Sequence, residues 1–547
     1  MRRIRRALAI IALVGAAGAC GDDTTGPGSL AGPTGVAVAQ LSLTSVRVSW
    51  NAVTDAESYR VERASAADPG TFTQVGGTIT GTTFDDTGLT TGVAYSYRVA
   101  GVAGGVAGTF SAAVSVTTGV AAGTIEGNIT ANRTLYTDTL YTLKGYVKVQ
   151  SGATLTVQPG TRIVGDTATF GSSLWILRGA KLMAEGTADA PIVFTSQRSL
   201  GNRKPGDWGG IVIVGNGIIN RTGTILTEGP AGIAENYAGG ANNADNSGSL
   251  RYVRIEFAGF DVSGGGNSEL NGLSMYAVGS GTTIECVQVT AGLDDSFEWW
   301  GGAVDGRYLI SYEAGDDHFD TSEGYIGRNQ FLIGFQESRL PPAAGTGVLA
   351  SDPQGFEMDG CSGSGCANGQ RSTPIADPLF ANFTMVGSGN VETTSSGGFG
   401  AVIRRGTALV FHNGIIARWK GTAITIRDSV TNNLDSVRIN NMILAENGKH
   451  YDDATADAAG PFGQEARFAS ANHRTAATAA SIITSLNPAS LDWTPLDIAT
   501  SGGGVVALPS SRTGGFFGGT MENTTYVGAV SPTGPKWYEG WSTYLAN

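Results

Sequence analysis

Two acidic segments hold the residues whose types and spacing are best suited to chemistry. Residues 294–298 read Asp-Asp-Ser-Phe-Glu, and residues 316–320, which begin 22 positions later, read Asp-Asp-His-Phe-Asp. If 22 residues form one coil of stacked parallel strands, the second segment lies beside the first at about 4.8 Å. Phe297 and Phe319 would then stack inward, and the outer acidic side chains would share one surface.

Six carboxylates this close repel each other unless something compensates, and three interpretations stay open. A bound Ca²⁺ would compensate, because it accepts several oxygen ligands in irregular geometry. A shared proton would compensate by raising the pKa of one carboxyl group, which is how a general acid is made. In the third interpretation the aspartates cap turns by accepting backbone N–H groups. The candidate calcium ligands are Asp294, Asp295, Asp316 and Asp317, and the candidate catalytic residues are Asp295, Glu298, Asp317 and Asp320, with Glu298 expected over Asp320.

Aromatic side chains near the acids suggest a platform on which sugar rings stack. Trp299, Trp300, Tyr312 and Tyr325 are its members, although the same rings would also serve to cover the edge of the core. The candidate ligand-binding residues are Trp299, Trp300, His318, Tyr325, Arg404 and Arg405, and the arginine pair is the nearest candidate base for a lyase reaction.

These residues need a repetitive scaffold to position them, and the chain from residue 125 onward has the pattern of one. Short apolar runs separated by Gly, Asn and Asp turns recur at a loose spacing near 19 to 24 residues, as at Leu155–Val157, Leu174–Ile176 and Ile192–Phe194. Such a period without long amphipathic helices indicates a solenoid. We therefore predict a right-handed parallel β-helix over residues 125–547.

Several segments of this region resemble a family of exported bacterial surface proteins with a pectin-lyase-like β-helix. These segments are Gly152–Gly165, Gly206–Ile213, Leu250–Gly259, Arg404–Gly406 and Tyr526–Trp541. The resemblance implies the fold but not the chemistry, because the family has no settled activity.

Gly315-Asp316-Asp317 also looks like the Gly-Asp-Asp motif of pectin-cleaving β-helix hydrolases, which use carboxyl groups for glycoside hydrolysis. Those enzymes carry a Gly-His-Gly turn and an Arg-x-Lys motif downstream. This chain has Phe-His-Asn-Gly at 411–414 and Arg-Trp-Lys at 418–420 instead. The order of the motifs is similar, but the motifs themselves differ.

Residues 32–118 alternate strongly and place strands at roughly ten-residue spacing, which predicts a small antiparallel sandwich. Trp50, Tyr59 and the run Tyr95-Ser-Tyr97 resemble the core Trp and later strands of a fibronectin type III module. Such a module usually spaces or presents another domain. Linkers are expected at 21–31 and 119–124.

The first 20 residues resemble a bacterial lipoprotein signal. Four arginines precede the apolar run Ala7–Ala19, which is too short to span a membrane, and Cys20 follows small residues. We expect Cys20 to carry lipid that anchors the mature chain to the membrane of the cell envelope, at the outer membrane or cell surface. The alternative is ordinary secretion with Cys20 discarded.

Export in either form permits disulfides. Cys361 and Cys366 close a short Gly-rich loop and are expected to pair, since a metal site would need further Cys or His ligands nearby. Cys286 is expected to be a buried free thiol. The chain has 547 residues with 82 Gly in no fixed period and a net charge of -12, which excludes collagen and argues against a nucleic-acid partner.

Two functions are compatible with these patterns. The first is a surface-anchored lipoprotein, expected to be a monomer, whose β-helix binds an extracellular glycan or another surface ligand without catalysis. The alternative is a polysaccharide-degrading hydrolase or lyase that uses the carboxylates of residues 294–320, with Ca²⁺ as a candidate cofactor. The incomplete hydrolase motifs favour the first function.

Overall fold

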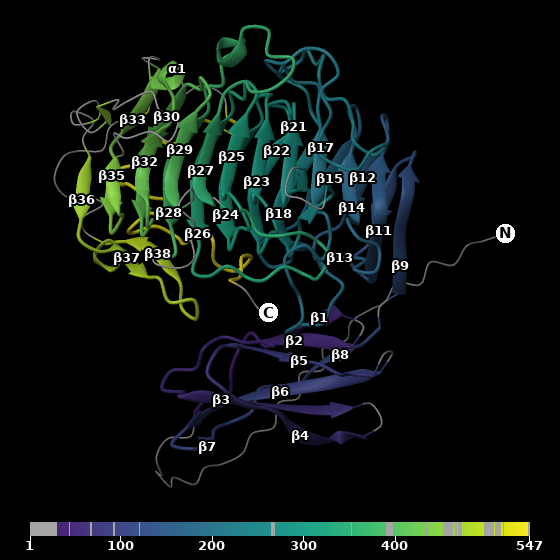
Figure 1. Ribbon diagram of the computed structural model, residues 1–547. Coiled ribbons are helices and arrows are strands. Elements are labelled where there is room, and N and C mark those ends of the chain that lie inside the picture. The colour runs from purple at the N-terminus through teal and green to yellow at the C-terminus, as the bar shows by residue number, and fades with distance from the viewer. Residues whose placement is uncertain are drawn as a thin grey trace. The chain divides into compact units, whose positions relative to one another are not determined.

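The structure is a computed structural model that describes residues 30–544 apart from several gaps. The expected signal segment with Cys20, and part of the stretch 452–520, lie outside the described residues. Residues up to 119 and residues from 120 onward form two compact units, whose elements Figure 1 labels. The gaps are 43, 66–67, 91–92, 120, 264–267, 352, 390–397, 433–435, 452–462, 465–467, 469–472, 497–507, 509–515 and 518.

The first unit is a sandwich of two antiparallel sheets, one of β1, β2 and β5 and one of β3, β4, β6, β7 and β8. Trp50 packs against Tyr59 in its core with ring centroids 5.3 Å apart. The predicted sandwich is therefore confirmed. The strands are β1 (Ala37–Ser42), β2 (Ser45–Ser49), β3 (Ser58–Ser65), β4 (Asp68–Ile79), β5 (Thr83–Asp86), β6 (Ala94–Ala103), β7 (Val106–Ala107) and β8 (Val114–Thr117).

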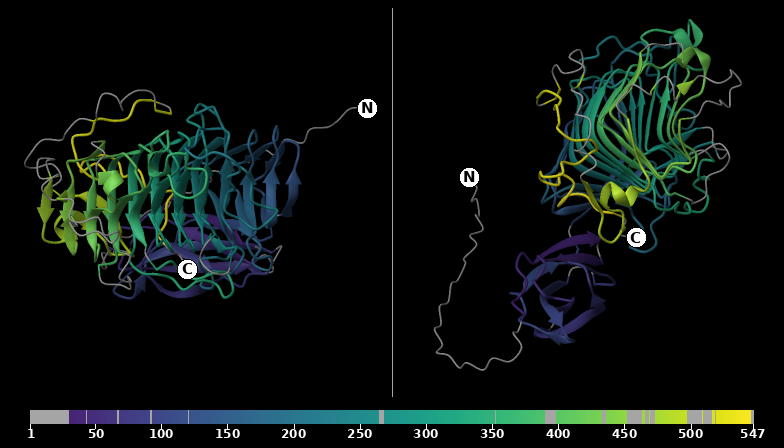
Figure 2. Two further views of the ribbon diagram at one scale, coloured as in Figure 1. Left: turned by 45° about the horizontal axis from the view of Figure 1, so that its top comes forward. Right: turned by 90° about the vertical axis from the view of Figure 1, so that its left-hand side faces the viewer.

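The second unit is a parallel β-helix in which three sheets, here called the first, second and third faces, surround one interior (Figures 1 and 2). The first face contains β10 (Arg133–Leu135), β12 (Thr154–Val157), β15 (Lys181–Glu185), β30 (Leu409–His412), β33 (Val437–Asn440) and the first halves of five long strands. Those long strands are β18 (Gly248–Glu256), β22 (Thr283–Thr290), β24 (Asp305–Tyr312), β26 (Arg328–Phe335) and β28 (Leu379–Val386).

The second face contains the other halves of the five long strands together with β13 (Arg162–Gly165), β16 (Ile192–Ser196), β31 (Ile415–Ala417), β34 (Ile443–Ala445) and β36 (Arg474–Ala476). The third face contains β14 (Ser173–Ile176), β17 (Ile211–Val214), β21 (Leu273–Tyr276), β23 (Phe297–Trp300), β25 (Phe319–Ser322), β27 (Gln354–Asp359), β29 (Phe399–Arg404), β32 (Thr422–Ile426) and β35 (Lys449–Tyr451). At the N-terminal end, β9 (Ala121–Ile129) pairs with β11 (Thr139–Val149), which reaches both the second and third faces.

The interior is a stack of apolar side chains that repeats from coil to coil. Phe297 pairs in register with Phe319, so 22 residues form one coil here, as predicted. Phe356 continues the stack, with ring centroids 5.3 and 5.6 Å apart along the three rings. Each fully buried Phe contributes roughly 1.5–3 kcal/mol of transfer free energy. This stack fixes the register of the outward-facing side chains between the rings.

The turn from the first face to the second is made by a single residue in many coils. These residues have φ between 50° and 64°, the left-handed region that non-glycine residues seldom adopt. In the five long strands the pairing skips this residue, so each strand bends without a loop, whereas Asn413 and Asn441 lie in two-residue connections between strands. They are Tyr252, Cys286, Tyr308, Phe331, Asn382, Asn413 and Asn441.

Long connections occur beside the third face instead. Residues 215–247 and 360–378 leave third-face strands, whereas 257–272 and 336–353 lead into them. The four segments hold the hairpin β19 (Phe260–Asp261) and β20 (Glu269–Leu270), the short helix η1 (Gly369–Arg371) and the disulfide between Cys361 and Cys366. Cys286 is a buried free thiol, as predicted.

The outer side of the second face is covered by residues 519–544, here called the C-terminal strap. Gln330 fastens it, because its amide donates to the Glu522 carbonyl at 2.7 Å and accepts from the Glu522 N–H at 2.9 Å. Asn382 donates to the Thr524 hydroxyl at 2.9 Å. The remaining elements are the hairpin β37 (Ile483–Ser485) and β38 (Asp492–Pro495) and the short helices α1 (Ser429–Asn432) and η2 (Ala479–Ser481). Among the described residues, every helix is too short or too polar to cross a membrane.

Candidate functional site

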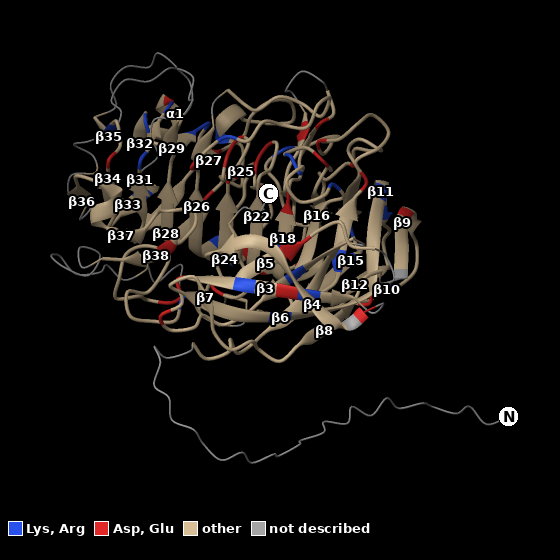
Figure 3. Cartoon of the chain, turned by 90° about the horizontal axis from the view of Figure 1, so that it is seen from below, with Lys and Arg blue, Asp and Glu red and all other residues tan. Residues whose placement is uncertain are grey.

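A cleft of about 580 Å³ lies on the third face, and the long connections beside that face form its walls. Its volume is within the range of ligand sites, roughly 300–1,000 Å³. Acidic positions (red) gather on and beside β25 and β27 in Figure 3. The side chains that line the cleft include two arginines, Arg221 and Arg405, and eleven carboxylates: Glu228, Glu269, Asp294, Asp295, Glu298, Asp316, Asp317, Asp320, Glu323, Glu357 and Asp359.

Glu298 and Asp320 form the centre of the floor. They pair in register on β23 and β25, the arrangement that the 22-residue offset predicts. Their side chains are 5% and 9% exposed. Carboxylate oxygens of these two residues and of Asp295 lie within 4.8 Å of one another. At this separation the ionisation of one carboxyl group strongly affects that of the other.

Asp295 and Asp317 belong to a ladder of hydrogen bonds that crosses the coils just before the third-face strands. Asn271 Oδ1 accepts the N–H of Asp295 at 3.2 Å, and Asp295 Oδ1 accepts the N–H of Asp317 at 2.8 Å. Asp317 Oδ1 in turn accepts the N–H of Gln354, and Gln354 Oε1 accepts the N–H of Phe399 at 3.1 Å. Two amides and two carboxylates thus perform the same structural task. This turn-capping role agrees with the third interpretation of the acidic segments.

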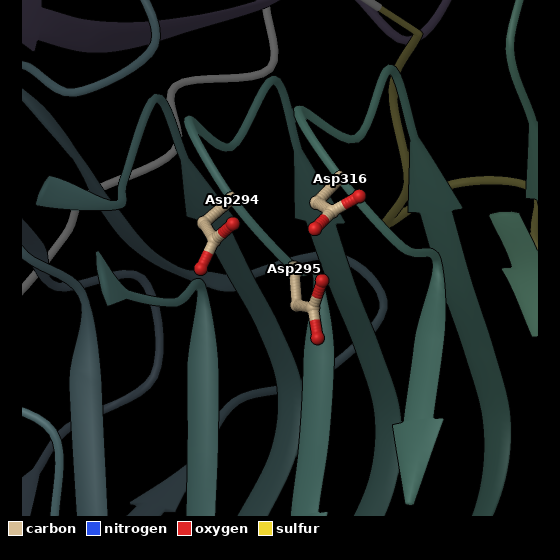
Figure 4. A group of neighbouring side chains, drawn as sticks. All are labelled: Asp294, Asp295 and Asp316. Carbon is tan, nitrogen blue, oxygen red and sulfur yellow. The ribbon is translucent and has the colours of Figure 1, made fainter. Parts of the chain in front are cut away.

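Asp294 and Asp316 take equivalent places on successive turns, with the carboxylate of Asp295 between them (Figure 4). One oxygen from each of the three lies within 4.8 Å of the others. Converging carboxylate oxygens suit Ca²⁺, which prefers several oxygen ligands. The donor set therefore fits that ion. Asp317, the fourth predicted ligand, is not a member of this group.

Burial is the main cause of the raised pKa values of the carboxyl groups in the cleft. Removal from water, followed by repulsion between neighbouring carboxylates, raises the pKa values of five floor acids well above the usual range: Asp294, Asp295, Glu298, Asp317 and Asp320. The same causes raise the pKa of Glu228 to about 8 and that of Glu269 to about 7. Several groups of the cleft are therefore protonated near neutral pH.

In the part of the cleft nearest β27 and β29, arginines neutralise the negative charge of the acidic side chains. Arg404 pairs with Glu357 and places Nε 2.8 Å from Asp359 Oδ1, while Arg405 also pairs with Asp359. Arg221 pairs with Glu323. These ion pairs raise the pKa of Arg404 above its usual value despite its burial, so the guanidinium acts as a counterion of the cleft acids in this structure. Arg405 lines the cleft, but Arg404 is not among the lining residues.

The aromatic platform predicted from the sequence is largely wrong. Trp299 and Tyr325 are fully buried in the interior, where their rings stack 5.5 Å apart. Tyr312 is buried on the outside of the second face against Trp493. Trp300 alone of the four lines the cleft and is partly exposed.

His318 is also not a cleft residue. It is 1% exposed, and its Nδ1 lies 2.5 Å from the Ser311 hydroxyl. Its ring packs edge-on against Trp419 with centroids 6.2 Å apart. Burial lowers its pKa to about 3, so the imidazole is neutral. The residue therefore packs beneath the floor and does not line the acidic cleft.

The sequence analysis missed Glu228, Glu269, Arg221 and Glu323. The first three lie in long connections beside the third face, where no repeat or strand alternation marks their position. Glu228 accepts hydrogen bonds from the Tyr276 hydroxyl at 3.2 Å and from Asn271 Nδ2 at 3.3 Å. These loop residues close the cleft over the acids that the repeat does predict.

Comparisons with known proteins agree with the two units. The model of the pectate-lyase-like β-helix domain family matches residues 127–494, and the model of the fibronectin type III domain matches residues 31–117. The predicted fibronectin type III module is thereby confirmed.

Shorter similarities accompany these matches. A poly(3-hydroxybutyrate) depolymerase of Ralstonia pickettii is 43% identical over 70 residues, which is 13% of this chain and 13% of that protein. Among solved structures, a Fn3-like protein from Clostridium thermocellum is 34% identical over 16% of this chain and 92% of its own, with a TM-score of 0.15. The FN1–FN3 domains of chicken CNTN1 are 24% identical over 16% of this chain and 30% of theirs, also with a TM-score of 0.15. The chain thus spans a small part of the curated relative.

Proposed function

The chain belongs to the pectate-lyase-like β-helix family, and from this premise we propose that its acidic cleft binds and cleaves a polysaccharide with Glu298 and Asp320 as the acid–base pair. The observation that carries the proposal is the placement of these two carboxyl groups, in register on adjacent coils, at the floor of a ligand-sized cleft. Glycoside cleavage needs one carboxylic acid to protonate the leaving oxygen and one carboxylate to act on water or on the sugar.

The surroundings of the pair support one protonated and one ionised member. Burial raises the pKa of both groups, and repulsion from Asp320 raises that of Glu298 further. When two carboxyl groups interact strongly, the first proton is lost much more readily than the second. A pair in this state offers an acid and a base at the same pH.

Catalysis accounts for the cleft better than binding alone. The binding function was predicted with an aromatic platform for sugar rings, and three of its four rings are buried away from the cleft. In the hydrogen-bond ladder, Asn271 and Gln354 perform the task of Asp295 and Asp317 without charge. The hydrogen-bond ladder therefore does not require the negative charges of Asp295 and Asp317.

A second candidate function is calcium-dependent binding of a glycan. The carboxylates of Asp294, Asp295 and Asp316 favour it, because their oxygens converge within 4.8 Å. A bound Ca²⁺ would neutralise the turn and bridge to hydroxyl or carboxylate oxygens of a ligand. In that case the floor pair would serve only to shape the site.

We further propose that the chain is exported and lipid-anchored through Cys20 to the membrane of the cell envelope, at the outer membrane or the cell surface. The signal-like N-terminus supports this, as does the disulfide between Cys361 and Cys366, since disulfides persist in oxidising compartments. A polymer-cleaving role suits such a location. The curated relative is itself called a depolymerase. It shares too few residues with this chain to identify the polymer.

Mass profiling of the oligosaccharides released from a broad polysaccharide panel tests the proposal. The full chain should release products, and Glu298→Gln or Asp320→Asn should lower turnover by about 10²- to 10⁴-fold. Glu126→Gln, at an exposed position of β9, is the matched control and should leave turnover unchanged. Absence of products from every substrate, together with calcium-dependent glycan retention, would support the second candidate instead.

A further inference from the structure

The charges of the cleft are unevenly distributed along the solenoid axis. Toward β27 and β29 the acids are paired with Arg221, Arg404 and Arg405. Toward β21 and β23, in the part of the chain that the structure describes, five carboxylates form no ion pair at all: Glu228, Glu269, Asp294, Asp295 and Glu298. Bound protons or positive charge supplied by a ligand must compensate this end, because no arginine or lysine among the described residues does so.

A buried hydroxyl gives independent evidence that a ligand belongs here. Ser322 lines the cleft and is 7% exposed, yet its Oγ has no hydrogen-bond partner among the described residues. A buried polar group without a partner is costly, so a ligand that supplies one is favoured. Trp300 pairs in register with Ser322 and offers a partly exposed ring beside it. A hydroxyl next to an aromatic ring is a common combination for holding a sugar.

We infer that the cleft takes a polysaccharide that bears free amino groups, that is, a polymer of amino sugars, and not the polyuronate that the name of its family suggests. The inference rests on the proposed function in one respect, namely that the ligand is a polysaccharide. Ammonium groups would lie against the carboxylates toward β21 and β23, and ring hydroxyls would reach Ser322.

The geometry of the solenoid suits such a polymer. Successive coils are about 4.8 Å apart, which is close to the length of one pyranose residue in an extended chain. A chain that runs along the axis would place successive rings over successive coils, and the rings over β21 and β23 would meet the unpaired carboxylates. Salt bridges of ammonium groups to partly buried carboxylates are screened much less than those on an open surface. A polyuronate would instead bring like charges together, which is unfavourable without bridging cations.

The test is calorimetric titration of the full chain with three hexasaccharides in EDTA at low salt. They are β-1,4-linked glucosamine, its fully N-acetylated counterpart, which has the same backbone without charge, and oligogalacturonate. We expect the glucosamine oligomer to bind at least about tenfold more tightly than the acetylated one, with an affinity that falls as salt rises. Oligogalacturonate should not bind, and added Ca²⁺ should compete with glucosamine.

Two variants locate the interaction. The double substitution Glu269→Gln with Asp294→Asn should weaken glucosamine binding at least about tenfold, and Asp295→Asn, which keeps the ladder, should weaken it in the same direction. Glu126→Gln should not. Equal binding of the two glucosamine-based oligomers, or binding of oligogalacturonate in EDTA, would overturn the inference.

The experiments can refute the inference and the proposed function independently of each other. If a neutral or acidic glycan is cleaved in a Glu298-dependent manner while glucosamine oligomers do not bind, the inference is wrong and the proposed function stands. If glucosamine oligomers bind as expected but no amino-sugar polymer is cleaved, the inference stands and the proposed function is wrong.

Discussion

Asp317 donates its backbone N–H to Oδ1 of Asp295 on the preceding coil at a distance of 2.8 Å. The rung before this one uses Asn271 as its acceptor, and the last rung of the same ladder uses Gln354. An amide oxygen therefore meets the structural requirement as well as a carboxylate does. The relationship separates what the aspartates do for the fold from what their charge does for the cleft.

The first prediction follows from this separation. Asp295→Asn keeps the acceptor and should unfold at nearly the same denaturant concentration as the parent chain. Asp295→Ala leaves the buried N–H of Asp317 unsatisfied and should be less stable than Asp295→Asn by about 1–3 kcal/mol. Urea unfolding followed by tryptophan fluorescence measures the difference. Equal stability of the two variants would show that the ladder does not hold the coils.

The second prediction concerns the pH dependence of stability. Burial and repulsion from Glu269 raise the pKa of Glu228 from its ordinary 4.5 to about 8. Between these values the folded chain holds a proton that the unfolded chain has released, so the stability that this group contributes is full below about pH 4.5 and is lost as the pH rises toward about 8. Thermal unfolding of the parent and of Glu228→Gln across this range should show a shallower decline in the variant. Parallel curves would contradict the assignment.

A third prediction addresses calcium. Ca²⁺ bound only by the folded chain raises stability by about 2.7 kcal/mol at 100 times its dissociation constant. Thermal unfolding should therefore shift upward in Ca²⁺ relative to EDTA, and the shift should vanish in Asp294→Asn with Asp316→Asn. Mg²⁺ serves as the control, because it demands stricter octahedral geometry. An equal shift with Mg²⁺ would indicate general charge screening rather than a site.

The fourth prediction concerns the C-terminal strap. Gln330→Ala removes both hydrogen bonds to the Glu522 backbone and should cost about 1–3 kcal/mol. Because β26 and the strap are far apart in sequence, the loss should also expose the strap to proteolysis under native conditions. Limited digestion with mass analysis would detect cleavage within residues 519–544. The exposed Glu126→Gln variant should resist digestion as the parent does.

The sequence predicted the floor of the site because the floor is part of a repeat. One 22-residue offset sufficed to place Glu298 over Asp320, since parallel pairing transmits the register of the interior Phe residues outward. Strand alternation also contained the information that Trp299 is buried, because it lies two residues after the interior Phe297 and shares its side of the strand. Trp300, the next residue, faces the cleft.

The residues of the cleft walls could not be predicted from the sequence, for a physical reason. Glu228 and Glu269 are placed by connections whose length and sequence follow no period, so their neighbours are set by long-range packing alone. Arg404 and Arg405 were recognised as site candidates, but their partners Glu357 and Asp359 turn them from reactive groups into counterions. The sequence does not show which charged side chains form ion pairs, because their partners come from distant positions in the chain.

The unequal lengths of the connections have an evolutionary consequence. One residue makes the bend between the first and second faces in many coils, so an insertion there would disrupt the register of every following strand. Insertions beside the third face leave the register intact and change only the rim of the cleft. Homologous chains can thus acquire new ligands by exchanging loops such as 336–353 while they inherit an unaltered framework.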